Sequence, residues 1–261
     1  MIMKKFALLT PLALALSTPI LAEESNAIDP ADVTKVYTQG AVLINGSSDT
    51  LLQGQVSGGL DNGQQFALLA EATFVDGDGD KNDFGTDYSN SRFQYFHVFE
   101  PGFEAIPKVG VSLDYINTRN AIKNDLLSVG AVAAINPALT GGFLIFPRLG
   151  AMTGTMEIPG LTDDKDDLLG YSASLITAKH IGKSGAYVSV VPEWMDLSGD
   201  EIDMQNLSVK VALNVPLNSN RTWWLNTRYD FVKSSVDYKD AALAGTGEWQ
   251  TEAWLGVRYY F

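Results

Sequence analysis

The stretch WQTEAWLGVRYYF, from Trp249 to Phe261, alternates between apolar and mostly polar side chains along its whole length. Leu255, Val257 and Tyr259 share one face with Trp249 and Phe261, and the residues between them include Glu, Gly and Arg. Successive side chains of a β-strand point to opposite faces of the sheet. The pattern therefore predicts a long strand with one apolar and one mostly polar face.

The same alternation recurs through the chain and predicts twelve strands. Most of the runs exceed the usual strand length of about 5–6 residues and suit a tilted membrane crossing of about 9–11 residues. The predicted strands are residues 36–45, 50–60, 64–75, 92–99, 108–117, 125–135, 143–153, 168–180, 186–195, 205–215, 221–232 and 248–261.

The connections between these runs alternate, after the first hairpin, between short turns and longer polar loops. Short turns on one side and longer loops on the other are typical of a transmembrane β-barrel, and an even number of strands closes such a barrel without edges. We therefore predict an all-β fold, a single antiparallel transmembrane β-barrel of twelve strands, with ten or fourteen as the counting alternatives. A soluble β-sandwich or lipocalin-like barrel is a competing interpretation, but such folds usually have shorter strands and turn their apolar face inward.

The sequence divides into three predicted regions. Residues 1–22 begin with Lys4 and Lys5, continue with an apolar stretch too short to span a membrane and end on Ala22, which predicts a secretory signal peptide. Residues 23–35 are expected to form a mobile periplasmic N-terminal tail, with folding back as a small plug as the less favoured alternative. Residues 36–261 are expected to form the barrel domain.

The C-terminal segment Ala253–Phe261 resembles the assembly signal of Gram-negative outer-membrane proteins, a final Phe preceded by aromatic and apolar residues at alternate positions. In this chain the matching residues are Leu255, Val257, Tyr259 and Phe261. The resemblance to this porin-like β-barrel superfamily implies a place in the outer membrane of a Gram-negative bacterium. It also implies outer-membrane lipids and lipopolysaccharide as surroundings, and the outer-membrane assembly machinery as a partner of the last strand.

Composition excludes several functions. The chain carries 18 Lys and Arg against 31 Asp and Glu, a formal net charge of −13, which argues against a nucleic-acid partner. It has no Cys, so thiolate catalysis and Cys-ligated metals are excluded. Only His97 and His180 could act as histidine bases, both fall near the same inferred periplasmic side, and no Gly-x-Ser-x-Gly sequence occurs. We therefore expect no enzyme, and an outer-membrane hydrolase ranks third among the functions considered.

The polar face of the strands is expected to turn toward the lumen and to carry five acids and five bases. Such side chains either line a passage for small polar solutes or pair with one another in a filled interior. We expect a passage, with a non-conducting surface-binding or structural barrel as the alternative. The predicted pore-lining residues are Glu71, Lys108, Asp114, Arg148, Glu193, Lys210, Arg228, Asp230, Glu252 and Arg258.

Three predicted outer loops, residues 76–91, 154–167 and 196–204, each carry a net charge of −4. Acids clustered at a pore mouth would favour cations, although they are equally consistent with a solvated surface. The first loop also resembles a calcium-binding loop through Asp76, Asp78, Asp80, Asn82 and Asp87, because hard cations prefer several oxygen ligands. Lys81 at its sixth position and an Asp at its twelfth depart from that pattern. Apart from this Ca²⁺, no cofactor is expected.

Overall fold

The computed structural model describes residues 28–33, 35, 37–76, 86–162, 164–239, 241–243 and 246–261. The predicted signal peptide, the start of the predicted tail, and Asp78, Asp80 and Asn82 of the predicted calcium loop lie outside these residues.

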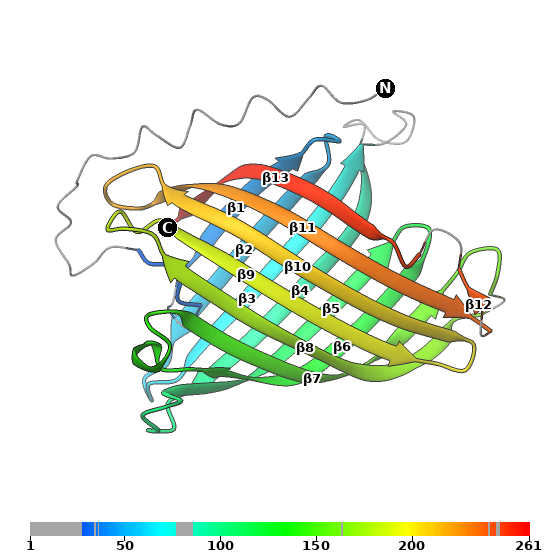
Figure 1. The fold of residues 1–261 in the computed structure, drawn as a ribbon, viewed down its shortest axis with the longest axis horizontal. Helices are drawn as coiled ribbons and strands as arrows, with labels where there is room; N and C mark the ends of the chain where they lie inside the picture. Colours follow the sequence, from blue (N-terminus) through cyan, green and yellow to red (C-terminus); the bar gives the residue numbers. More distant parts are fainter. Residues whose placement is uncertain are drawn as a thin grey trace.

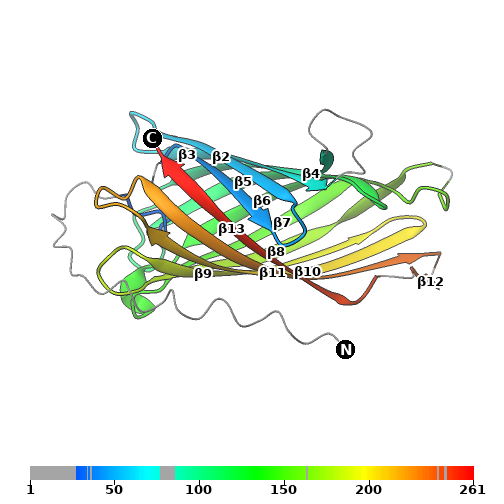
Figure 2. The ribbon, with the colours of Figure 1, turned by 90° about the horizontal axis from the view of Figure 1, so that it is seen from above.

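Twelve long strands wind around one closed barrel (Figure 1 and, turned by 90°, Figure 2). A short strand β12 (Ala241–Ala242) pairs with the end of β11, and a single 3₁₀ turn, η2 (Pro137–Leu139), lies between β6 and β7. The long strands are β1 (Gln39–Asn45), β2 (Thr50–Gly59), β3 (Gln65–Asp76), β4 (Thr86–Phe99), β5 (Lys108–Arg119), β6 (Lys123–Ala134), β7 (Leu144–Glu157), β8 (Asp166–His180), β9 (Tyr187–Ser198), β10 (Ile202–Pro216), β11 (Trp223–Tyr238) and β13 (Trp249–Tyr260).

Each long strand pairs antiparallel with its sequence neighbour, and β11 pairs with β13. The barrel closes where β1 pairs with β13, with Val42 opposite Val257. The prediction of twelve antiparallel strands in one transmembrane-type barrel is therefore confirmed. None of the helices in the described part of the chain has the length and apolar character that a membrane crossing requires.

The two ends of the barrel differ. The proximal rim, where residues 28–33 and Phe261 lie, is at the left in Figure 1, and the distal rim, near β12, is at the right. The predicted contrast between short proximal turns and long distal loops is wrong. Beyond the first hairpin, which the prediction left out, the distal connections 120–122 and 199–201 are shorter than every proximal one.

The strands continue into the segments predicted as distal loops. β7 runs on to Glu157, β10 already begins at Ile202 and β11 reaches Tyr238. Ladder hydrogen bonds are made by the backbone, so polar side chains did not end these strands. At the β9–β10 turn the Asp166 carboxylate accepts hydrogen bonds from three backbone N–H groups, those of Asp200, Glu201 and Ile202. Asp166, which the sequence pattern had placed in a loop, thus stabilises a tight hairpin.

The outer surface of the barrel is apolar over its middle. Soluble proteins rarely expose a large contiguous apolar surface, whereas a barrel in lipid needs one. The surface is therefore that of a membrane-spanning protein. Its exposed side chains include Val42, Ile44, Leu52, Val56, Leu68, Phe93, Val111, Leu113, Leu127, Val129, Leu149, Leu169, Leu213, Phe231, Leu255 and Val257.

The interior has three levels. Near the distal rim lies an apolar layer, the charged layer described below lies in the middle, and an aromatic layer of Tyr187, Trp224 and Tyr260 lies near the proximal rim. In the aromatic layer the Trp224 ring contacts the two tyrosine rings edge to face, with centroids 5.8 and 6.2 Å away. The distal apolar layer consists of Leu126, Met152, Met156, Ile158, Leu168, Met195, Leu197, Ile202, Met204 and Val236.

The segment before β1 enters the proximal mouth of the barrel. Ala31 is only 1% exposed and packs against the aromatic layer, together with Ile28 and Tyr37. Of the residues expected to form a mobile tail, Ile28 and Ala31 therefore pack against the aromatic layer at the proximal mouth. The physical reason is that the aromatic layer gives the apolar side chains of Ile28 and Ala31 a surface to pack against. We call residues 28–33, 35 and 37 the N-terminal segment.

Candidate functional site in the lumen

The first wall of the charged layer joins four strands. Arg92 on β4 donates from Nε to Asp114 Oδ1 at 2.9 Å and from Nη1 to Glu193 Oε1 at 3.0 Å. Arg148 on β7 lies 3.3 Å from Asp114, measured between Nη2 and Oδ2. It also donates to the hydroxyls of Ser112 and Ser128. Two arginines and two carboxylates therefore compensate one another in the interior.

The second wall lies on β2, β3 and β11. Arg228 Nη2 lies 2.6 Å from Asp230 Oδ2, and Arg228 Nη1 lies 3.9 Å from Glu71 Oε1. Glu71 also accepts a hydrogen bond from the Gln53 amide. The Glu71 side chain is 28% exposed, so water reaches this wall. Charged groups in a protein interior need ion-pair partners or water. Both walls contain ion pairs, and the second wall is also open to water at Glu71.

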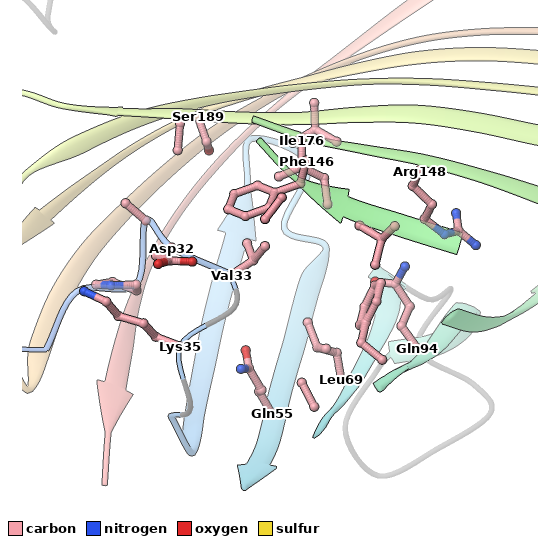
Figure 3. Close-up of a pocket in the computed structure, with 18 of the residues that line it drawn as sticks. Asp32, Val33, Lys35, Gln55, Leu69, Gln94, Phe146, Arg148, Ile176 and Ser189 are labelled. Carbon is pink, nitrogen blue, oxygen red and sulfur yellow. The ribbon is translucent and has the colours of Figure 1, made fainter. Parts of the chain in front are cut away.

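A cavity of about 300 Å³ lies between the charged layer and the N-terminal segment. Figure 3 shows Asp32, Val33 and Lys35 of this segment lining it together with Phe146, Ile176 and Ser189 of the barrel strands. Six basic side chains line the cavity against two acidic ones, Asp32 and Glu193. The basic residues are Lys35, Arg92, Lys108, Arg148, Lys210 and Arg258.

The ten predicted pore-lining residues fall into four groups. Lys108, Arg148, Glu193, Lys210 and Arg258 line the cavity. Asp114 belongs to the first wall, whereas Glu71, Arg228 and Asp230 make the second. Glu252 lies opposite Asp230 in the register and is exposed.

Sequence reasoning missed Arg92, which contacts carboxylates from two other strands. The predicted strand started at Arg92 itself, so its inward direction was not considered. Arg92 is opposite Glu71 in the β3–β4 register, which places both on the inner face. Counting alternation backward from the cavity-lining Gln94 would have found it.

The N-terminal segment is held at the proximal rim by a small polar cluster. Asp29 lies 2.8 Å from Lys35 Nζ and 2.7 Å from His180 Nε2. Its backbone N–H donates to the Tyr37 hydroxyl at 3.0 Å. Burial of Asp29 opposes its ionisation, but the hydrogen bonds from Lys35 and His180 outweigh burial and hold the pKa of Asp29 below its usual value. His180 thus serves as an anchor for this segment.

His97 lies on β4 near the proximal rim. Its Nδ1 contacts the Tyr95 hydroxyl at 2.9 Å, its Nε2 contacts Gln64 Oε1 at 2.8 Å, and its ring packs against Phe99. Neither partner of the His97 ring is a carboxylate or a nucleophilic serine. The surroundings are those of an interfacial polar group.

The distal rim keeps its acids, but within shorter turns. Asp164, Asp167, Asp200, Glu201 and Asp203 are exposed there. Of the predicted calcium ligands, Asp76 is the last residue of β3 and Asp87 lies in β4 opposite Val75. Both ends of the predicted loop of residues 76–91 therefore belong to strands. Among the described residues, no group of three or more His, Asp or Glu is arranged to hold a metal ion.

The outward residues of β13 face the membrane side. Leu255 and Val257 are exposed, and the terminal Phe261 is the most exposed large apolar side chain described. The Tyr259 ring contacts those of Trp223 and Phe261, with centroids 4.7 and 5.0 Å away. The four residues of the assembly-signal resemblance thus line the lipid-facing edge of the last strand.

No family model and no curated protein matches the sequence. Several solved structures are similar in shape at low identity. The KdgM porin is 11% identical, with 87% of this chain and 99% of that one covered and a TM-score of 0.45. An anion-selective porin from Comamonas acidovorans is 12% identical, with 87% and 97% covered and a TM-score of 0.38. A loop L8 deletion mutant of OmpT, an outer membrane protein of Vibrio cholerae, is 14% identical, with 86% and 98% covered and a TM-score of 0.37.

Proposed function

We propose that this barrel is a narrow channel for small polar solutes in the outer membrane of a Gram-negative bacterium, with its proximal rim toward the periplasm. The observation that carries the proposal is the partly wetted charged layer beside a cavity in the lumen. Paired charges lining a constriction favour hydrated solutes over apolar ones and hold the strand walls at a fixed spacing. The small cavity limits the size of the solute.

The distal rim would favour cations at the mouth. Asp200, Glu201 and Asp203 are exposed within one short stretch. Asp164 lies on the β7–β8 connection, and Asp167 lies at the start of β8. Such a cluster raises the local cation concentration within about 8 Å at physiological salt.

A liposome-swelling assay tests the channel. Liposomes with the full barrel should swell in small sugars and amino acids, and swelling should fall steeply as solute size increases. A variant that lacks residues 23–35 should admit larger solutes, because the N-terminal segment narrows the proximal mouth. If neither protein increases swelling above that of empty liposomes, the barrel is not a channel.

A salt gradient tests the selectivity. The reversal potential should indicate cation preference, and Asp200→Asn combined with Asp203→Asn should reduce that preference. Asp61→Asn changes an exposed acid at the proximal rim and serves as the control. An anion-selective reversal potential that is unaffected by the distal substitutions would contradict the role given to the distal acids.

A non-conducting structural or surface-binding barrel is the second candidate. The observations that favour it are the buried distal apolar layer and the N-terminal segment in the proximal mouth. In that case the charged layer would fix the barrel shape, and lipopolysaccharide or a surface ligand would be the partner at the distal rim.

Two further proposals concern processing and assembly. Removal of residues 1–22 would leave Glu23 as the first residue, which N-terminal sequencing of the purified protein would check. Docking of the last strand on the assembly machinery would depend on Phe261, so Phe261→Ser should lower the yield of folded barrel in the outer membrane. Tyr229→Ser removes another exposed aromatic side chain, on the outer face of β11, and as the control should lower it less.

Calcium binding at Asp76, Asp78, Asp80, Asn82 and Asp87 stays a prediction. A calorimetric titration with Ca²⁺ would check it, and absence of saturable binding at millimolar concentration would exclude it.

A further inference from the structure

The positive charge that lines the cavity is not fully balanced by contact. Arg92 and Arg148 are compensated by Asp114 and Glu193. Lys210 on β10 also lines the cavity. Within the described ranges it forms no hydrogen bond or close ion pair, and Glu71 and Glu193 attract its charge only from a longer distance. A lysine that lacks such a partner inside a barrel is costly unless water or a ligand supplies the counter-charge.

Arg258 on β13 adds a second cation whose contacts are neutral. It donates to Gln53 Oε1 at 3.1 Å and to the Tyr260 hydroxyl at 3.4 Å, and it forms no ion pair with a described carboxylate. Its Nε is buried with no hydrogen-bond partner among the described atoms. The nearby acid Glu71 is already engaged by Gln53 and Arg228.

The rest of the lining is largely apolar. Val132, Phe146, Ile176 and Val191 contribute to the wall of this cavity of about 300 Å³. Ligand pockets of small organic molecules begin at about this volume and combine an apolar wall with a few placed polar groups. Inorganic anions would leave the apolar wall without a partner, whereas an organic anion would use both parts of the surface.

We propose that this cavity is a binding site for a small organic carboxylate, with Lys210 and Arg258 as its cationic side and the apolar wall around its hydrocarbon part. This inference rests on the proposed channel and names a class of solute for it. The N-terminal segment covers the site from the proximal rim, where Lys35 lines the cavity and is paired with Asp29. The acidic distal rim lies at the other end of the barrel. A solute would therefore meet the acidic rim and the basic cavity at different points along the lumen.

Calorimetric titration of the full barrel in detergent tests the site with two probes of the same shape, benzoate and the neutral benzamide. Benzoate should bind saturably, and benzamide at least about tenfold more weakly, because it lacks the charge that Lys210 requires. Lys210→Met should weaken benzoate binding about tenfold and leave benzamide unaffected. Lys183→Met alters an exposed lysine of the β8–β9 turn and should change neither.

Equal affinity for the two probes, or unchanged benzoate binding in Lys210→Met, would overturn the proposal. Should Lys210→Met fail to fold, titration of the unaltered protein at rising salt decides, since benzoate binding must weaken with salt and benzamide binding must not. Conductance of the same preparation separates the two claims. A conducting barrel that does not distinguish benzoate from benzamide refutes this site alone, and a barrel that binds benzoate without conducting refutes the channel alone.

Discussion

At the scale of single residues, Arg92 is the side chain on which the charged layer depends most. It contacts Asp114 and Glu193, which come from β5 and β9. Among the described residues, Arg148 is the one other arginine paired with both carboxylates. Removing one partner of a buried ion pair leaves an uncompensated charge and costs about 3–5 kcal/mol. Arg92→Met should therefore lower the free energy of unfolding by about that amount, measured by guanidinium titration in detergent with tryptophan fluorescence.

The matched control is Arg119→Met, which removes an arginine from an ion pair with Asp125 at the distal rim. The Arg119 side chain is 37% exposed, and exposed pairs contribute at most about 1 kcal/mol. Equal losses for the two variants would contradict the importance given to the charged layer. Arg92 was missed because the predicted strand began at that residue, whereas Asp114 and Glu193 lay inside predicted strands. The ion pairs of Arg92 with these two carboxylates join separate strands, and alternation along one strand does not show such contacts.

At the scale of elements, the N-terminal segment is the part whose docking depends on pH. The folded-state pKa of Asp29 is lowered, so its contribution to docking is present above the usual value of 3.8 and is lost as pH falls through the folded value. The chain has no Cys, so Ala31→Cys gives a single reporter at a buried position. Maleimide labelling of this residue should be slow at neutral pH, and Asp29→Asn should accelerate it.

Asp61→Asn, in an exposed proximal turn, is the control and should leave the labelling rate unchanged. Rapid labelling in the otherwise unaltered protein would show that the segment does not occupy the mouth. Sequence alone could not establish this docking, because Ile28 and Ala31 become buried only against Tyr187, Trp224 and Tyr260, which come from three distant strands.

The closing strand pair contains a second sensitive position. Gly256 lies opposite Leu43 across the β1–β13 pair, and a Cβ at Gly256 would clash with the backbone oxygen of Val42. Gly256→Val should therefore weaken barrel closure and increase the fraction of unfolded protein on unheated gels. Gly54→Val, on β2, is the control, since a Cβ there meets no atom within 4 Å. Equal folding of both variants would contradict the close approach of β1 and β13.

At the scale of the whole molecule, positive charge gathers around the proximal half of the lumen, while exposed acids occupy the distal rim. Fixed charges that differ between the two ends of a pore make the current depend on the direction of the applied voltage. The barrel should therefore rectify at low salt. Rectification should fade near 1 M salt, where the screening length is about 3 Å. Rectification that persists unchanged at 1 M would point to a moving gate instead of fixed charge.

The architecture of the barrel was predictable to a large extent, because lipid outside and polar groups inside impose the alternation directly on the sequence. Val257 and Arg258 show this, since the first is exposed on the outer face and the second lines the cavity. The lengths of the distal loops were not predictable, because strands such as β10 continue through polar residues by backbone pairing. The buried distal layer, which includes Met152 and Met204, was also missed, since apolar residues at inward positions weaken the alternation.

The most direct test of the channel is planar-bilayer recording of the full barrel in symmetric salt. The account predicts small, uniform conductance steps, and larger steps when residues 23–35 are removed. Absence of conductance steps from both proteins, with folding confirmed on unheated gels, would contradict the channel and favour the non-conducting barrel.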